Sequence, residues 1–194
     1  FLALILVLET GMNGTFVALD LILFFVFFEI VLLPMYFMIG IWGDKTVRTV
    51  AGFKNQIETR LYASIKFFVF TLFGSAFMLL GFLGLYYRGN RTFSIPELIE
   101  LGTNGAFTGT FAMLVFAVLF LGFAVKVPMW PLHTWLPDAH TAAPTVGSVL
   151  LAAILLKLGS YGFVRIAIPI LPEQAKAWAP AIAILSAIGI IYGS

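Results

Sequence analysis

Long apolar runs separated by short polar segments dominate the sequence. Four runs are long enough to be complete spans, namely Phe16–Ile41, Ala63–Tyr87, Phe107–Trp130 and Ala142–Val164, and shorter runs at 1–8 and 179–194 flank them. A spanning helix needs about 20 apolar residues. The runs are apolar almost all round, with glycine and alanine interspersed, which favours close helix packing in lipid. The pattern predicts an all-α, polytopic transmembrane bundle. The two end runs look cut, so we expect an internal piece of a longer protein.

Composition narrows the class of protein further. Hydrophobic residues make up 61% of the 194 positions and charged residues only 10%, which leaves the lipid bilayer as the expected surroundings. The absence of cysteine excludes a disulfide scaffold, a cysteine-held metal and a thiol nucleophile. A net charge of +2 is too small for a nucleic-acid interface. We find no repeat and no soluble domain boundary, so residues 1–194 are one transmembrane domain.

The loop charges predict an orientation. The loop before the second span holds Glu9 and Asp20 and no basic residue, whereas Asp44–Arg60 is rich in lysine and arginine: Lys45, Arg48, Lys54 and Arg60. Positive charge accumulates on the cytoplasmic side of membrane proteins. We therefore place Asp44–Arg60 and, by alternation, His133–Thr141 in the cytoplasm, with Glu97 and Glu173 outside. Lys66 is expected to reach the headgroups, and Asp20 to cap a helix or lie at the interface.

Three ionisable residues lie well inside apolar spans: Glu29, Lys126 and Lys157. Each charge at a helix centre costs about 2.5–3.5 kcal/mol, so such groups face a bundle interior or a wet cavity and usually mark an ion path. Burial disfavours the charged form of a lysine and a nearby carboxylate favours it. A change in the distance between Glu29 and Lys126 would then cause Lys126 to bind or release a proton. The alternative is a Glu–Lys pair that only fixes helix register.

A cluster of prolines follows Lys126 directly. Pro128, Pro131 and Pro137 remove backbone donors, so we expect the helix to break near residues 126–131. Transporters build ion sites at such breaks, although the prolines could also simply end the helix at the interface. His133 is a candidate proton relay, and His140 is assigned no role. Two histidines and Asp138 are weak evidence for a metal, and we predict none. Gly147, Gly159 and Gly162 are expected to let helices approach closely.

Two stretches carry a family resemblance. The run Lys126–Pro144 (KVPMWPLHTWLPDAHTAAP), continuing through Thr145–Gly162, resembles the chain M (chain 4) family of the proton-pumping NADH-quinone oxidoreductase, respiratory complex I; Phe27–Gly40 (FFEIVLLPMYFMIG) fits the same family. The resemblance covers essentially the whole chain. It implies most of one of two inverted five-helix repeats of an antiporter-like subunit, with a discontinuous helix.

The resemblance also implies roles for residues. By motif position, Glu29, Lys126 and Lys157 match the groups that carry protons in that family, and His133 matches a histidine of the motif. Flavin, iron–sulfur clusters and quinone belong to partner subunits in such a complex, so we expect no cofactor and no NADH site here. Expected partners are other membrane subunits and protons, in a bacterial inner membrane. The alternative is a subunit of a sodium/proton antiporter or of a membrane-bound hydrogenase.

Overall fold

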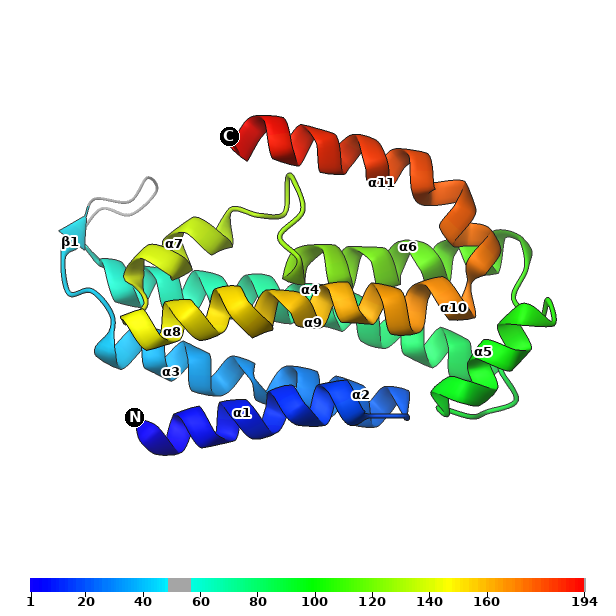
Figure 1. The fold of residues 1–194 in the computed structure, drawn as a ribbon, viewed down its shortest axis with the longest axis horizontal. Helices are drawn as coiled ribbons and strands as arrows, with labels where there is room; N and C mark the ends of the chain where they lie inside the picture. Colours follow the sequence, from blue (N-terminus) through cyan, green and yellow to red (C-terminus); the bar gives the residue numbers. More distant parts are fainter. Residues whose placement is uncertain (49–56, 194) are drawn as a thin grey trace.

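The computed structural model describes residues 1–48 and 57–193. Its long helices lie side by side along one direction and form a bundle (Figure 1). In chain order the elements are α1 (Leu2–Val17), α2 (Leu21–Ile30), α3 (Leu32–Trp42), β1 (Val47–Arg48), β2 (Ile57–Glu58), α4 (Thr59–Arg88), α5 (Ile95–Thr103), α6 (Gly109–Lys126), α7 (Trp135–Ala142), α8 (Thr145–Leu150), η1 (Leu151–Leu155), α9 (Leu156–Gly162), η2 (Phe163–Ala167), α10 (Ile168–Ile170) and α11 (Pro172–Gly193). Both η segments are π-helical and lie within the continuous helix Thr145–Ile170. Among the described residues, β1 and β2 form the only sheet.

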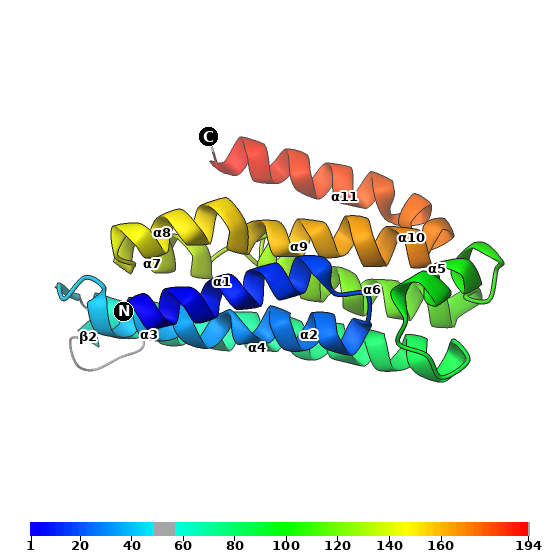
Figure 2. The ribbon, with the colours of Figure 1, turned by 60° about the horizontal axis from the view of Figure 1, so that its bottom comes forward.

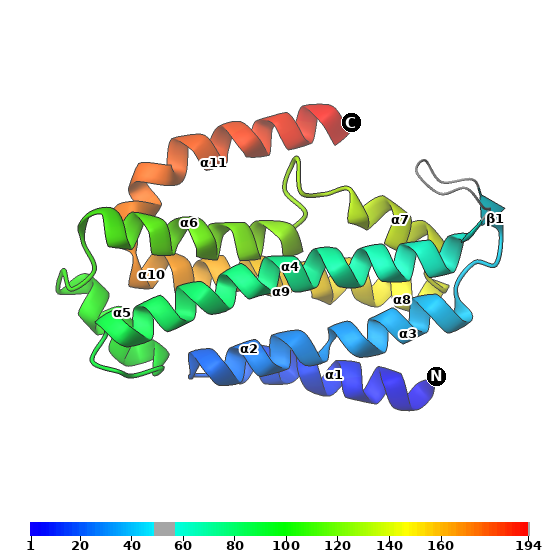
Figure 3. The same cartoon turned by 180° about the vertical axis from the view of Figure 1, so that it is seen from behind.

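The predicted transmembrane bundle is confirmed. Five helical stretches of the described chain are long and apolar enough to cross a membrane: Leu21–Trp42, Thr59–Arg88, Gly109–Lys126, Thr145–Ile170 and Pro172–Tyr192. α4 runs the full length of the bundle and packs against α3, α6 and α7 (Figure 3). α11 contacts α6 through Trp178 but is the least covered of these helices, since none of its apolar window is buried (Figure 2).

The chain reverses earlier than its hydropathy predicts. Phe16 belongs to α1, not to the second span, and Glu9 is an exposed residue of α1 rather than a loop residue. The turn falls at Ala18–Asp20, where Asp20 caps α2 by accepting hydrogen bonds from the amides of Ile22 and Leu23 at 2.9 and 3.0 Å. The N-cap prediction for Asp20 is confirmed. Hydropathy misses the reversal because Asp20 is the only charged residue in the turn.

The short helix α5 lies in a segment that the sequence analysis assigned to a loop, and it covers one end of the bundle. Ser94 pairs with Asp20 in an isolated bridge, and the Leu21 amide donates to the Phe93 carbonyl at 2.9 Å. α5 then packs against α10. The sequence signal was present, since Ser94 and Glu97 have capping-box spacing and Pro96 suits a first helical turn.

The opposite end brings two connecting segments together. The Asp44 amide donates to the Ala142 carbonyl at 2.9 Å, so the loop after α3 and the α7–α8 junction lie at the same end, while α5 and the start of α11 lie at the other (Figure 1). Hydrogen bonds from Thr46 hold the pKa of the exposed Asp44 carboxyl below its usual value. Lys54 lies outside the described residues. The loop after α3 and the α7–α8 junction thus lie at one end of the bundle, as the predicted alternation of the spans requires. Their assignment to the cytoplasmic side stays a prediction.

Glycines allow α6 to approach its neighbours. A Cβ on Gly74 of α4 would lie 2.8 Å from Val125, and one on Gly159 of α9 would lie 2.8 Å from Val127 and 3.1 Å from the Lys126 Cβ. Gly162 packs in the same way against Phe123. The atoms nearest to a Cβ on Gly147 belong to Pro144 and Ala143, at 3.4–3.6 Å, which is ordinary van der Waals contact. The packing role predicted for Gly159 and Gly162 is confirmed, and that for Gly147 stays a prediction.

Gly159→Ala is expected to lower stability, because the added methyl group overlaps the α6 backbone and side chains around Lys126. Overpacking of this kind costs about 1–3 kcal/mol, against about 1 kcal/mol gained in helix propensity. The midpoint of thermal unfolding of the purified protein measures the effect. Gly189→Ala on α11 is the matched control, since nothing lies within 4 Å of its added Cβ. Equal midpoints for the two variants would contradict the packing described here.

Candidate functional site

Glu29 lies in the last turn of α2, beside an interruption of the second span. α2 ends at Ile30 and α3 begins at Leu32, with Val31 between them. Pro34 accounts for the interruption, because it cannot donate to the carbonyl of Ile30 and its ring crowds that carbonyl. The Glu29 side chain is half-buried and points into the bundle, where one carboxylate oxygen is fully enclosed.

Lys126 is the last residue of α6 and its side chain is enclosed, with 2% of the residue exposed. The helix stops here because Pro128 cannot continue the hydrogen-bond ladder. The ammonium lies 4.7 Å from the centre of the Phe28 ring, within range of a cation–π interaction. Its place at a helix C-terminus also favours positive charge, because the last carbonyls carry partial negative charge.

Glu29 and Lys126 interact through space rather than by direct contact. The Glu29 Oε1 and the Lys126 Nζ both lack a hydrogen-bond partner among the described residues, so no direct hydrogen bond joins them. The charge of Lys126 nevertheless acts on the Glu29 carboxylate, and the buried Ser75 side chain of α4 interacts with the same carboxylate. Buried polar atoms without partners are rare in proteins and demand an explanation. The arrangement suits groups whose charge changes, rather than a fixed ion pair.

The helix break is a non-helical excursion between α6 and α7. Residues 127–134 leave the bundle and return at Trp135, whose buried indole Nε1 donates to the Val125 carbonyl at 2.9 Å. Pro128 and Pro131 lie in this excursion, and Pro137 lies in the first turn of α7. Asp138 is therefore on a helix rather than on the expected loop, as is His140. The apolar helix of the fourth span is α6 alone, Gly109–Lys126, and the excursion and α7 follow it.

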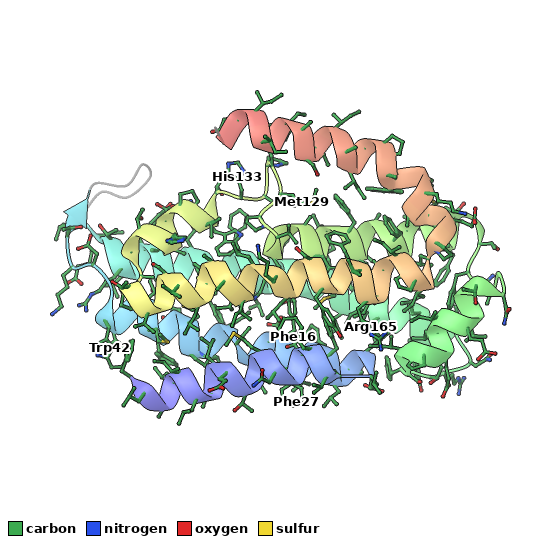
Figure 4. All side chains as sticks on the ribbon, in the orientation of Figure 1. Phe16, Phe27, Trp42, Met129, His133 and Arg165 are labelled. Atoms are coloured by element: carbon green, nitrogen blue, oxygen red, sulfur yellow. The ribbon has the colours of Figure 1, made fainter. Side chains whose placement is uncertain are left out.

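His133 lies in the excursion and contacts α11. Figure 4 places Met129 and His133 on the segment that rises from the bundle toward α11. The His133 ring contacts the Tyr192 ring edge-on with centroids 5.5 Å apart, and its buried Nδ1 has no hydrogen-bond partner among the described residues. The structure thus brings His133 to α11 rather than to the Glu29–Lys126 pair.

Lys157 also stands apart from the pair. It lies on α9 two residues before Gly159, which packs on Lys126. Residues two apart point to opposite sides of a helix, and the Lys157 side chain is exposed on a face that the described chain leaves uncovered. The structure therefore brings Glu29 and Lys126 within electrostatic reach of one another, whereas Lys157 lies on the opposite side of α9 from the contact with Lys126.

Lys66 has an acidic partner that the sequence did not suggest, and its expected position at the headgroups stays a prediction. Its Nζ forms an ion pair with Asp138 Oδ2 at 2.7 Å and lies 5.6 Å from the Tyr62 ring centre. Both charged side chains are about one-fifth exposed. Asp138 lies on α7, a segment that hydropathy assigns to a loop. Nothing in the sequence therefore indicated that Asp138 would be the partner of Lys66. The ion pair ties α7 to α4.

Phe28 and Ser75 are site residues that the sequence analysis missed. Phe28 is one of many phenylalanines in α2, and nothing in its spacing distinguishes it. Ser75 had a usable signal, because Thr71 and Ser75 lie four residues apart in an apolar span and are both buried. Polar positions with helical spacing in a span indicate a face turned toward other polar groups.

The comparisons decide the family. The family model described as "NADH:quinone oxidoreductase/Mrp antiporter, TM" matches residues 18–194, nearly the whole chain. The chain belongs to this family. It is an integral, multi-pass membrane protein, as the five apolar spans already indicated.

Relatives and solved structures agree with this assignment. NADH-quinone oxidoreductase subunit M of Rhodobacter capsulatus is 46% identical over 97% of this chain and 36% of the relative. NADH-ubiquinone oxidoreductase chain 4 of Prototheca wickerhamii is 46% identical over 97% of this chain and 33% of its own length. Among solved structures, a chain of respiratory complex I from Thermus thermophilus matches with a TM-score of 0.84 and 34% identity, over 99% of this chain and 38% of that chain.

A second solved structure that matches belongs to a different membrane complex. A chain of an archaeal membrane-bound sulfane sulfur reductase superposes with a TM-score of 0.75 at 26% identity, over 93% of this chain and 34% of that chain. The chain thus spans about a third of the length of the relatives it matches. Among the described residues, no group of three or more His, Asp or Glu side chains is placed to hold a metal ion.

Proposed function

We propose that the chain is part of a proton-translocating membrane subunit of NADH-quinone oxidoreductase. In this proposal, electron transfer from NADH to quinone takes place in partner subunits and drives protons through the buried Glu and Lys residues. Three similar proteins support it, because two are named as subunits of NADH-quinone or NADH-ubiquinone oxidoreductase and the third is a chain of respiratory complex I. The flavin, the iron–sulfur clusters and the quinone belong to the partners, and this chain holds no redox cofactor.

One structural observation carries the proposal: the enclosed ammonium of Lys126 beside the Glu29 carboxylate, with no direct hydrogen bond between them. A fixed structural ion pair gains its stability from close contact and satisfied hydrogen bonds. Here the two charges influence each other at a distance, so a change at Glu29 alters the stability of the charged form of Lys126. This is what a lysine that gains and loses a proton requires.

The other site residues receive roles from their positions. Lys157 is the group to which the proton passes next, across α9 from Lys126 and on the face that other helices of the assembly cover. His133 is a proton relay at the excursion, and Pro128 and Pro131 produce the break that opens the end of α6. The neighbouring membrane subunits act on Glu29 electrostatically. The setting is the bacterial inner membrane.

Two assemblies have to be distinguished by experiment, since the family description also includes Mrp antiporters. The full-length protein is tagged and purified from its own membranes. Flavin and iron–sulfur proteins are expected to co-purify, and NADH is expected to drive proton uptake into inverted vesicles at a rate independent of sodium. Purification without redox subunits, with sodium-dependent proton exchange and no response to NADH, would instead establish the antiporter and contradict the proposal.

A further inference from the structure

The hydrogen bonds at the end of α6 leave the carbonyl of the buried Val125 without a backbone donor. Pro128 has no N–H for the Ala124 carbonyl, and the Met129 amide donates to Ala124 instead, at 2.9 Å. In a regular helix that amide would donate to Val125. The Val125 carbonyl, one residue before Lys126, therefore needs a donor from elsewhere. An unpaired carbonyl at membrane depth is costly.

Trp135 supplies this donor from the far side of the excursion. Its indole Nε1 lies 2.9 Å from the Val125 oxygen, and the side chain is enclosed, with 1% of the residue exposed. The tryptophan ring packs on Phe67 of α4, with centroids 5.4 Å apart. The bond reaches across ten residues of sequence, so it closes the excursion and joins α6 to α7.

The ion pair described above holds the same part of α7 on α4. Asp138 lies one turn after Trp135 on α7, and Lys66 precedes Phe67 on α4. Residues three apart on a helix lie on the same face, so the ion pair at 2.7 Å and the Trp135–Phe67 contact act at neighbouring points of one interface. The position of the indole is thereby fixed relative to α4, which also carries Ser75 beside Glu29.

We propose that Trp135 is a positioning residue for Lys126: its indole N–H caps the broken end of α6, and the Lys66–Asp138 ion pair holds Trp135 in place. Because α2 and α6 both pack on α4, this arrangement sets the position of the Lys126 ammonium relative to Phe28 and Glu29. The inference rests on the proposed proton-carrying role of Lys126. It extends that role to Trp135, Lys66 and Asp138, which lie outside the Glu29–Lys126 pair.

The test removes the N–H while keeping the shape of the side chain. Trp135 is replaced by 3-benzothienylalanine, which has sulfur in place of the indole N–H, in the full-length protein within its complete membrane assembly. NADH-driven proton uptake per assembled complex is expected to fall about tenfold, because small displacements of a reacting group lower rates steeply. Trp135→His, which keeps a ring N–H, is expected to retain more uptake than Trp135→Phe.

The matched control is the same replacement at Trp178 of α11, whose ring packs on Phe116 and Phe120. Unchanged uptake is expected there. Full uptake with 3-benzothienylalanine at position 135 would overturn the inference. The Lys126→Met variant, measured alongside, distinguishes failure of this inference from failure of the proposed function. If Lys126→Met abolishes uptake while the position-135 variants are normal, only the positioning role fails. If Lys126→Met has no effect, the proposed function itself fails.

A charge exchange tests the second half of the inference. Lys66→Asp and Asp138→Lys are each expected to lower uptake per assembled complex, because each leaves like charges facing one another. The double variant restores opposite charges at the same two positions and is expected to recover much of the loss. Uptake in the double variant no better than in the worse single variant would show that the ion pair does not hold Trp135 in its working position.

Discussion

Lys126→Met is expected to abolish NADH-driven proton uptake while leaving assembly intact. Methionine is unbranched, flexible and close to lysine in length, so it fills the enclosed site without leaving a cavity. Losing the buried ammonium removes its desolvation cost, and Glu29 loses a partner to which no direct hydrogen bond ties it, so the variant is expected to assemble. What disappears is the only titratable group at the end of α6. Removing a group that transfers a proton lowers rates by about a hundredfold or more.

Proton uptake into inverted vesicles, divided by the amount of assembled complex, measures this effect. Lys176→Met is the matched control, because Lys176 lies on α11 with an exposed side chain paired to Glu173 at 3.3 Å. The control is expected to pump normally. Normal uptake by Lys126→Met would show that the lysine is a spectator, whereas loss of assembled complex with normal uptake in what remains would show a purely structural role.

Glu29→Gln is expected to lower proton uptake about tenfold, because the charge that stabilises protonated Lys126 is lost. Glutamine matches glutamate in shape and retains an oxygen for Ser75, so the packing of α2 against α4 is unchanged. Glu29→Asp keeps the charge on a shorter side chain, so its uptake rate is expected to lie between those of the unchanged protein and Glu29→Gln. The measurement is again uptake per assembled complex.

Glu97→Gln on the outer helix α5 is the control for Glu29, since that carboxylate is exposed and remote from Lys126. It is expected to pump normally. An uptake rate for Glu29→Gln equal to that of the control would mean that Lys126 works without its carboxylate neighbour. The electrostatic coupling between the two would then be without function.

The features that depend on local chemistry could be predicted from the sequence. The membrane spans follow from long apolar runs, the cap at Asp20 from its place before an apolar helix, and the break after Lys126 from three closely spaced prolines. Glu29 and Lys126 stood out because charge is costly at membrane depth. None of these predictions required knowledge of which helices touch.

The features that depend on long-range contacts could not be predicted. Asp138 is an ion-pair partner because α7 is helical and lies on α4, and hydropathy gave no sign of that helix. Trp135 binds the Val125 carbonyl because the excursion returns to the bundle, which is a tertiary result. The early reversal at Ala18 was missed for a different reason, since the turn is nearly as apolar as the helices it joins.

The measurement that most directly tests whether Lys126 carries a proton is uptake by Lys126→Arg. Arginine keeps the positive charge that acts on Glu29, but it does not release its proton in proteins. If Lys126 gains and loses a proton in each cycle, the arginine variant is expected to assemble normally and to pump as poorly as Lys126→Met. If the positive charge alone matters, arginine restores uptake that methionine abolishes, and that result would contradict the proton-carrying role proposed for Lys126.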